Sequence, residues 1–536
     1  MSRRLPCPTS PTRPSVLPIP PILPVLPIVA AALVLLSAAA CIKRPVANPN
    51  VIVVAVASAP NALDPRVASD NVSQSANQLM FDGLMTFDAQ LRVIPALAER
   101  LENPEPTTYV VPLRHGVLFH DGHELTSADV VYTFRSLMEP DFVSPYKGAF
   151  RLLKSVEARD RYTVVFTLKE PFGSFPINLV QPQIVPDGAS RSLRDRPVGT
   201  GPYRFVKTVV DDSLEVAAFD RYFRGRPKND GVIMKVVPDN IMAGLELRKG
   251  TTDVVVNDLP PDIVAQLEGD RRLHTTQSPG VDYQYMGLNM RDPVLKDVRV
   301  RQAIGYAIDR QAIIEYLRRG MAIQATGILP PMSWAFDPQA FTFTFDPARA
   351  RALLDEAGYR DPDGDGPAAR LRLTLKMSSI EFNRLQGAVI QQNLRAVGID
   401  LEVRTYEFAT LFADVLAGNF QMYFLQWTGG SVADPDILRR VFHSDQVPPA
   451  GFNRGHFSDP RVDSLLDEAT TSTDEARRRQ LFNQAQRLIA EQAPYISLWC
   501  KTNVVVAQRD LAGIDPLPTL DFSFLKDVSR LRPTSD

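Results

Sequence analysis

The chain has 536 residues, of which 45% are hydrophobic and 22% are charged. This composition is that of a globular protein of several domains, and it excludes disorder, collagen or coiled coil for the chain as a whole. The 59 Lys and Arg against 61 Asp and Glu give a net charge of −2, so no basic field is present to attract nucleic acid. Three cysteines are too few for a disulfide framework, and their spacing has no zinc-ligand pattern.

The first 40 residues have the pattern of an export signal. Arg3, Arg4 and Arg13 form a positive region, and an uninterrupted apolar stretch follows at residues 28–36. This stretch is shorter than the roughly 20 residues that cross a bilayer, but it fits a signal peptide. We therefore expect residues 1–40 to be a signal peptide and the mature protein to be exported. No later stretch of the sequence is apolar enough to span a membrane.

The small residues directly before Cys41 resemble a bacterial lipobox, in which a lipid is attached to the cysteine. The match is imperfect because Ala38 stands where lipoboxes usually have leucine. The alternative is cleavage by signal peptidase after Ala40, which would leave the cysteine unmodified. We expect lipidation at Cys41, with residues 41–50 forming the lipidated N-terminus and a tether to the membrane.

Helical and strand patterns alternate along the rest of the chain. We predict strands at residues 51–57, 156–168 (a hairpin), 214–219, 232–237, 253–256, 283–288, 371–376, 400–406 and 495–506. We predict helices at residues 75–84, 129–137, 240–249, 298–318, 348–357, 380–397, 409–417, 460–469 and 473–492. This alternation is typical of an α/β fold with a parallel or mixed sheet and helices on its faces. No disordered linker separates the lobes, which predicts that hinge strands connect them.

A series of short motifs then identifies a family resemblance over almost the whole mature chain. The motifs are NALDP (61–65), FDGL (81–84), PALAE (95–99), LRHGVLFHDGHELTSADVVYTF (113–134), VGTGPY (198–203), YFRGRP (222–227), DVRVRQAI (297–304), AIDR (307–310) and ARALLDEAGY (350–359). In this order they resemble the solute-binding proteins of the peptide/nickel class, family 5, which deliver ligands to ABC importers. No single motif decides the matter, but together they are strong evidence.

The resemblance implies a particular organisation of domains. The fold is expected to be α/β and similar to the type II periplasmic binding proteins, with two lobes, mixed sheets, a hinge and an extra inserted domain. We expect domain I to be built from residues 51–75, 195–282 and 493–536. Domain II would comprise residues 76–194, and domain III residues 283–492. A ligand would be enclosed between the lobes as they close.

The resemblance also implies where charged groups of a ligand would be bound. In peptide-binding members, an aspartate three residues after the equivalent of Trp427 pairs with the ligand's α-amino group. This chain has Gly430 at that place, and Asp434 follows a little further on, which weakens the case for a zwitterionic di- or tripeptide. Arg384 lies near the place where dipeptide binders have an arginine for the ligand carboxylate, which a guanidinium binds with two hydrogen bonds.

The remaining predicted ligand-binding residues fall into two segments. They are Ser73, Gln74 and Ser75 in the first domain, and Tyr406, Phe408, Trp427 and Thr428 in the third. The first segment would present a polar edge to which an extended peptide could add as a strand. The aromatic residues of the second segment would either stack on a ligand or belong to the core.

Three further motifs could carry chemistry, but each has a simpler interpretation. His120 and His123 suggest a metal site, and a glycine turn with solvated histidines explains them better. The acidic run at residues 361–366 begins like a calcium-binding loop but has Arg372 where the twelfth position needs glutamate. Ser431 lies in a sequence similar to a nucleophile elbow, with Ala433 in place of the second glycine. We therefore predict no catalytic residues, no metal and no cofactor.

The sequence thus predicts an exported binding protein that captures a peptide or a similar small polar solute for an ABC permease. We expect a monomer that reaches the membrane through its lipid anchor and does not bind nucleic acid. Within the same fold, the ligand could instead be an oligosaccharide, an opine or a metal chelate. A secreted hydrolase, whose turnover Ser431→Ala would abolish, and a sensor or chaperone-like protein without a ligand are the alternatives from other classes.

Overall fold

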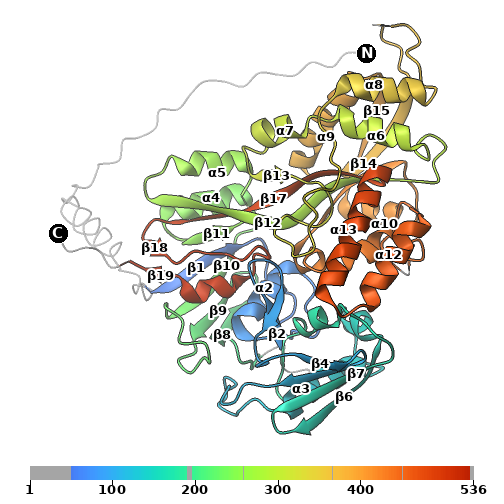
Figure 1. The fold of residues 1–536 in the computed structure, drawn as a ribbon. Helices are drawn as coiled ribbons and strands as arrows, with labels where there is room; N and C mark the ends of the chain where they lie inside the picture. The colour runs from blue at the N-terminus through green and yellow to red at the C-terminus, as the bar shows by residue number, and fades with distance from the viewer. Residues whose placement is uncertain are drawn as a thin grey trace, which may run out of the picture. The chain divides into compact units, whose positions relative to one another are not determined.

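The structure is a computed structural model that describes residues 50–189, 193, 196–257, 259–364, 366–449 and 451–531. The predicted signal peptide, Cys41 and the tether as far as residue 49 lie outside these residues, as does Asp365 of the acidic run. Strands and helices alternate through most of the described chain (Figure 1). The predicted α/β fold is therefore confirmed.

Most strands belong to one large mixed sheet. In spatial order its strands are β15 (Ile399–Tyr406), β14 (Leu371–Ser378), β16 (Met422–Trp427), β12 (Leu273–Leu288), β17 (Tyr495–Gln508), β11 (Val254–Val256), β1 (Val51–Val56), β10 (Gly231–Val236), β9 (Ser213–Ala218) and β8 (Tyr203–Val209), with β13 (Ala322–Gln324) paired to β17. Strands β1, β10 and β11 run parallel to one another, as do β14, β15 and β16. The sheet thus contains two parallel groups of strands with β12 and β17 between them.

Strands β12 and β17 are the longest in the sheet, with 16 and 14 residues, and they connect the two parallel groups (Figure 1). They pair with each other in antiparallel fashion over nearly their whole length. The end of β17 pairs with β11 on one side and with the start of β12 on the other, whereas the end of β12 pairs with β16. The pairing register shifts between Pro279 and Tyr283, opposite Thr502 and Cys500. This irregularity marks the boundary between the two halves, where the predicted hinge strands are found.

Helices cover both halves of the large sheet. Beside the first parallel group lie α2 (Asn71–Met80), α4 (Asn240–Lys249), α5 (Pro261–Glu268) and the short 3-10 helix η6 (Phe522–Asp527). The second half carries α6 (Val298–Ala307), α7 (Arg310–Ala312), the π-helical turn η4 (Ile313–Leu317), α8 (Pro347–Glu356), α9 (Glu381–Arg395), α10 (Phe408–Leu416), the 3-10 turn η5 (Gly429–Val432), α11 (Ile437–Phe442), α12 (Pro460–Thr471) and α13 (Glu475–Gln492).

A separate four-stranded antiparallel sheet is built from the region between β1 and β8. Its order is β4 (Glu102–Glu105), β5 (Thr108–Pro112), β7 (Thr163–Leu168) and β6 (Leu153–Asp160), and α3 (Ser127–Met138) packs against it with the 3-10 helices η1 (Lys147–Phe150) and η2 (Phe175–Leu179). Two small pairs complete the fold: β2 (Met85–Phe87) with β3 (Val93–Pro95), and β18 (Leu511–Ala512) with β19 (Ser529–Arg530). The four-stranded sheet has its own apolar core.

Aspartates start many of the helices. An N-terminal turn leaves several backbone N–H groups without partners, and an aspartate side chain before the turn accepts from one of them. This is the role of Asp70 at α2, Asp239 at α4, Asp297 at α6, Asp309 at α7, Asp346 at α8, Asp459 at α12 and Asp474 at α13. The negative charge also interacts favourably with the helix dipole.

Two predicted helices differ from the structure. The helix predicted at residues 75–84 instead spans α2, because Asp70 caps it and Phe81 is already extended. The long helix predicted at residues 298–318 is interrupted at Ile308, whose backbone is extended, and Asp309 starts a new helix there. Strands β8 and β16, helix α5 and the first half of β12 were not predicted.

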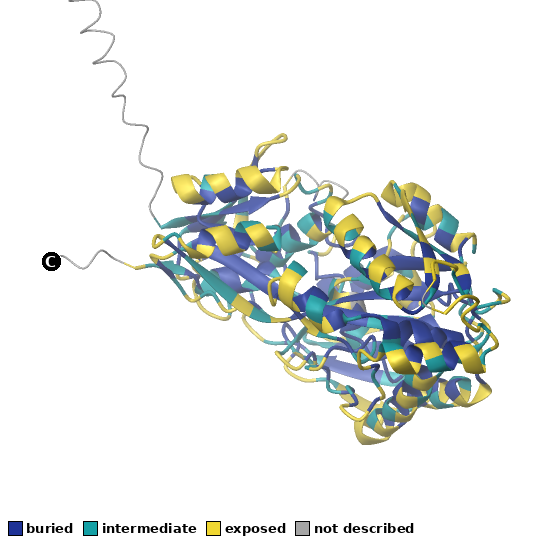
Figure 2. Cartoon of the chain, turned by 90° about the horizontal axis from the view of Figure 1, so that it is seen from above, coloured by how far each residue is buried: buried dark blue, intermediate teal, exposed yellow. Residues whose placement is uncertain are grey.

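The apolar residues of the described chain form several buried clusters on the faces of the sheets. Figure 2 shows the strands of the large sheet largely buried and the outward faces of the helices exposed. One cluster lies under α6, α8 and α9, and a second lies under α11, α12 and α13. Among the described residues, no helix is both long and apolar enough to cross a bilayer.

Candidate functional site

The carboxyl ends of the two groups of parallel strands point toward each other along the hinge strands. Val256, the last residue of β11, lies opposite Val505 of β17. Trp427, the last residue of β16, lies opposite Tyr283 of β12, which in turn pairs with Cys500. The two strand ends are thus five residues apart on β17, about 17 Å of strand. Open α/β sheets bind ligands outside the carboxyl ends of their strands, so this region is the candidate site.

Three aromatic or polar residues mark this edge in the second half of the sheet. Ser378 and Tyr406 are the paired last residues of β14 and β15, and Trp427 ends β16. The Lys376 ammonium lies 5.3 Å from the centre of the Tyr406 ring. The Arg454 guanidinium lies 5.0 Å from the centre of the Trp427 ring, and the buried indole N–H of Trp427 has no hydrogen-bond partner among the described residues. The predicted residues Tyr406 and Trp427 therefore lie on one edge.

A polar cluster that the sequence did not predict lies at the hinge itself. Asp282 of β12 accepts hydrogen bonds from the Gln426 side chain at 3.0 Å and from the Gly429 backbone N–H at 3.2 Å. The Lys501 ammonium is 3.9 Å from the same carboxylate. Burial raises the pKa of Asp282, and Lys501 lowers it in part. A carboxylate thus contacts the loop that follows Trp427.

A second unpredicted cluster surrounds Arg318, at the end of η4. Its guanidinium donates to the Gln386 side-chain oxygen at 2.9 Å and to that of Gln284 at 3.4 Å. The rings of Phe382 and Trp499 lie 5.4 Å and 5.3 Å from it. Gln284 also accepts from the Trp499 indole N–H at 2.6 Å. The cluster thus connects the hinge strands with the first turns of α9.

The predicted residues of the first segment lie on α2. Ser73 is fully buried, and its hydroxyl oxygen accepts from the backbone N–H groups of Asn61 and Ala62 at 2.8 and 3.0 Å. The Gln74 side chain donates to the carbonyl oxygen of Ser69 at 3.3 Å, and Ser75 is half-buried. Ser73 therefore holds the loop after β1, and no bond or ion pair joins this segment to the other predicted residues in the part of the chain that the structure describes.

Arg384 and Phe408 lie at the beginnings of the helices that follow β14 and β15. Arg384, in the first turns of α9, is exposed and forms an ion pair with Glu381. Phe408 is 54% exposed and stacks on Phe412 with ring centres 5.8 Å apart. Both residues thus lie near the same edge of the sheet as Tyr406 and Trp427, and the side chains of both are exposed to solvent. Their roles in ligand binding stay predictions.

The other predicted residues follow Trp427. Thr428 and Gly430 are exposed and belong to the turn at η5. Asp434 is buried, and its carboxylate accepts from the Asp436 backbone N–H at 3.1 Å and from the Ser174 hydroxyl at 3.4 Å. Ser174 belongs to the region of the four-stranded sheet. Asp434 therefore lies at a contact between this region and the second half of the large sheet, not beside the open strand ends.

This contact includes further hydrogen bonds. The Gly173 backbone N–H donates to the carbonyl oxygen of Thr470 at 2.7 Å. Arg478, which is buried, donates to the carbonyl oxygen of Gly173 at 3.0 Å and to the hydroxyl of Ser174 at 2.5 Å. A short loop is thus held from both sides by residues some 300 positions later in the sequence.

Asp434→Asn is expected to change how stability depends on pH. Burial and the nearby Asp436 carboxylate raise the pKa of Asp434 to about 6, although Arg440 and Arg478 oppose the shift. Because the folded protein holds this proton more tightly than the unfolded chain, Asp434 costs stability as the pH rises from about 4 to about 6. The variant should be more stable than the wild type at pH 7, by roughly 3 kcal/mol at most, and equal to it below pH 4.

Urea unfolding of both proteins at pH 4 and pH 7 measures this difference directly. Asparagine keeps an oxygen that can accept from Ser174, so the contact itself is conserved. If the variant and the wild type differed in unfolding free energy by the same amount at pH 4 and at pH 7, the raised pKa of Asp434 would be contradicted.

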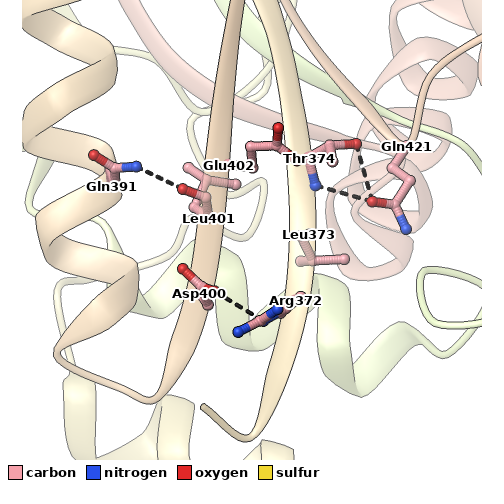
Figure 3. Close-up of a pocket in the computed structure, with 8 residues that line it drawn as sticks. All are labelled: Arg372, Leu373, Thr374, Gln391, Asp400, Leu401, Glu402 and Gln421. Atoms are coloured by element: carbon pink, nitrogen blue, oxygen red, sulfur yellow. Dashed lines mark hydrogen bonds and ion pairs between the residues drawn. The ribbon is translucent and has the colours of Figure 1, made fainter. Parts of the chain in front are cut away.

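The structure also contains a surface pocket of about 500 Å³, shown in Figure 3. It is lined by Arg372, Leu373, Thr374, Gln391, Asp400, Leu401, Glu402 and Gln421. Its polar groups bond to one another: Arg372 pairs with Asp400 at 3.0 Å, and Gln391 donates to the carbonyl oxygen of Leu401 at 2.6 Å. Arg372 and Asp400 lie near the starts of β14 and β15, so this pocket is at the opposite edge from the strand ends.

The two histidines that suggested a metal site have separate partners in the structure. His120 accepts from the Gly199 N–H at 3.2 Å, and its other ring nitrogen is 3.0 Å from the carbonyl oxygen of Gly201. Burial lowers the pKa of His120 to about 4. His123 instead contacts Asp121 at 2.7 Å. Among the described residues no group of three or more His, Cys, Asp and Glu is arranged to hold a metal ion.

Comparison with known proteins decides the family. The profile of the bacterial extracellular solute-binding proteins, family 5, matches residues 92–448. The chain belongs to this family. It is 31% identical over 501 residues to a glutathione-binding protein, GsiB, from Pectobacterium atrosepticum, which covers 91% of this chain and 95% of that protein.

Solved structures of the family have the same fold. The oligopeptide-binding protein AppA from Bacillus subtilis, in complex with a nonapeptide, matches with a TM-score of 0.73 and 26% identity, over 90% of this chain and 99% of AppA. NikZ from Campylobacter jejuni, in complex with Ni(L-His), matches with a TM-score of 0.75 and 25% identity, over 90% of this chain and all of NikZ. The fold is therefore that of the type II periplasmic binding proteins, as the motifs predicted, and the chain is a solute-binding protein of the kind that works with ABC permeases.

Proposed function

We propose that this protein is the exported binding component of an ABC importer and that it captures a short peptide or a similar small polar solute between two closing lobes. In this proposal the lobes are domains I and II, built from residues 51–282 and 493–536, and domain III, residues 283–492. The lobes move about β12 and β17, and the solute is bound where the strand ends face each other.

The observation that carries the proposal is the convergence of the strand ends at the hinge. Val256 ends β11 and Trp427 ends β16, and each points toward the other along β17. Exposed apolar side chains lie on both sides: Ile241 and Met242 start α4 after β10, and Ile380 and Phe408 lie at the starts of α9 and α10. Enclosing a solute there would remove these surfaces from water and strengthen each polar contact to the solute.

The relatives' ligands suggest the class of solute to test first. The relatives include proteins named for glutathione and structures with a nonapeptide and with Ni(L-His). We propose for this chain a ligand of the short-peptide class, glutathione included. We further propose that the protein is a monomer anchored by lipid at Cys41 and that it makes and breaks no bonds in its ligand.

A thermal-shift screen of the purified protein tests the ligand class. The panel contains di- and tripeptides, glutathione, an oligosaccharide, an opine and a nickel–histidine complex. A peptide at 100 times its Kd should stabilise the protein by about 2.7 kcal/mol, because it binds only the folded state. If only a non-peptide compound of the panel raises the melting temperature, the protein is still a solute-binding protein, but the proposed short-peptide class of ligand is wrong.

A further inference from the structure

The hairpin of β2 and β3 reaches from one apolar core into another. At its base, Met85 and Leu97 are buried in the core of the four-stranded sheet. At its tip, Leu91 is only 1% exposed and belongs to the cluster under α11, α12 and α13. The other buried members of that cluster, among the described residues, all lie within residues 281–500. The hairpin therefore starts in one of the proposed lobes and inserts its tip into the other.

The backbone at this tip is unusual for a leucine. Leu91 has a φ of +58°, in the left-handed region that glycine and asparagine adopt far more readily. The Asp88 carboxylate holds the turn, because it accepts from the backbone N–H groups of Gln90 at 2.8 Å and Arg92 at 2.9 Å. A bulky side chain kept in such a conformation indicates that the side chain itself has a function. Here the side chain fills space in the opposite core.

Two further connections join the same region of the chain to the first turns of α13. The Arg92 guanidinium lies 3.9 Å from the Glu475 carboxylate, and both side chains are about half exposed. Arg478, one turn further along α13, donates to the carbonyl oxygen of Gly173 and to the hydroxyl of Ser174. The hairpin tip (residues 88–92) and the loop at Gly173 therefore both contact the beginning of α13 or the cluster beneath it.

The contact of the hairpin tip is weaker than the connection through the hinge. The burial of one leucine side chain is not directional, and an exposed ion pair contributes little. Strands β12 and β17, by contrast, are paired over nearly their whole length. When the lobes move apart, the hinge strands are therefore expected to stay paired and the hairpin tip to leave the opposite core.

We propose that the hairpin tip is a latch: Leu91 packs into the opposite core when the lobes are closed over a solute and leaves it when they open. The latch rests on the proposed function and adds to it a control of how long a solute stays bound. Because Leu91 contacts the opposite lobe and not the solute, the latch slows the release of different solutes by the same factor.

Leu91→Gly tests the latch, because glycine adopts the left-handed turn and removes the side chain. A peptide found in the thermal-shift screen should dissociate about 10- to 100-fold faster from this variant, the range that corresponds to exposing one leucine side chain to water. The matched control is Asp211→Gly in the turn between β8 and β9, where Asp211 is exposed with a φ of +55°. The control should keep the wild-type rate. A wild-type rate in Leu91→Gly would overturn the proposal.

Two peptides with different side chains distinguish a latch from a direct contact with the solute. The latch predicts that Leu91→Gly speeds the dissociation of both by the same factor. A factor that depends on the side chains of the peptide would mean that Leu91 contacts the solute, and the latch would be wrong. The melting temperature of the ligand-free variant should stay near that of the wild type, because Leu91 is in water when the lobes are open. A leucine that is always packed would lower it.

Thiol labelling of Leu91→Cys, read by mass spectrometry, tests the latch without any ligand. Cys500 is the internal reference: it is buried, and burial raises the pKa of its thiol to about 12, so it reacts only when the protein unfolds. In the ligand-free protein, position 91 should react at least about 10-fold faster than Cys500, because local opening needs less free energy than global unfolding. Equal rates at the two positions would mean that only unfolding releases the tip, which contradicts the latch.

The two proposals fail in different ways. If no peptide of the screen binds, the proposed peptide function fails, and the labelling at position 91 still decides whether the hairpin tip is released. If a peptide binds and dissociates from Leu91→Gly at the wild-type rate, the peptide function stands and only the latch is refuted.

Discussion

Gly173→Ala is expected to weaken ligand binding by about 10- to 100-fold. A β-carbon at this position would lie 1.9 Å from the carbonyl oxygen of Ser472, which belongs to the backbone and cannot move aside cheaply. The loop also donates to Thr470 and accepts from Arg478, so the clash would break a contact between the proposed lobes. Because the ligand binds the closed form, a smaller closed population lowers the apparent affinity in proportion.

The measurement is the Kd of a ligand found in the screen, for Gly173→Ala and for Gly148→Ala. Gly148 lies in the same region, and a β-carbon there meets no atom within 4 Å. A lower melting temperature with an unchanged Kd would show that the loop is permanently packed against α12 and α13, and that closure does not involve it.

Gly280→Ala is expected to destabilise the whole fold, by about 1–3 kcal/mol, because it overpacks the crossing of the two hinge strands. A β-carbon on Gly280 would lie 2.4 Å from the carbonyl oxygen of Lys501 and 2.6 Å from the side-chain oxygen of Asn503. Asn503 is itself buried and donates to the carbonyl oxygen of Pro518 at 3.0 Å, so it has little freedom to move. The clash therefore lies between β12 and β17, the two strands that run through both halves of the large sheet.

Urea unfolding of Gly280→Ala, with Gly327→Ala as the control, measures this cost. A β-carbon on Gly327 meets nothing within 4 Å, so the control should unfold at nearly the wild-type urea concentration. Equal stability of the two variants would mean that β12 and β17 are not tightly packed at this point, and the hinge would have to be placed elsewhere.

The sequence predicted the alternating elements well where local signals were strong. Helix α4 was predicted with its observed bounds, because a glycine, Gly250, follows its last residue. In the structure Gly250 ends the helix in the left-handed conformation, at φ +68°. Tyr406 and Trp427 were predicted for one cleft side, and they do lie on one edge, because parallel strands end together. Strand β12 was predicted at less than half its length, since residues 273–282 lack an apolar alternation and become a strand only through pairing with β17.

The clusters at the site could not be predicted, because they depend on pairing between distant segments. Arg318 reaches Gln284 and Gln386 only after η4, β12 and α9 have packed together. Asp282 reaches Gln426 across 144 residues of sequence, and Arg478 reaches Gly173 across 305. Such residues carry no local signal of their role. Conversely, Ser73 was predicted to contact ligand, and the structure places its hydroxyl within a buried turn.

Small-angle scattering from the wild-type protein, with and without a saturating peptide from the screen, tests most directly whether two lobes close around a solute. Rotation about β12 and β17 brings the halves together, so the radius of gyration should fall when the peptide is added. Identical scattering curves at a peptide concentration that titration shows to be saturating would contradict closure around the solute.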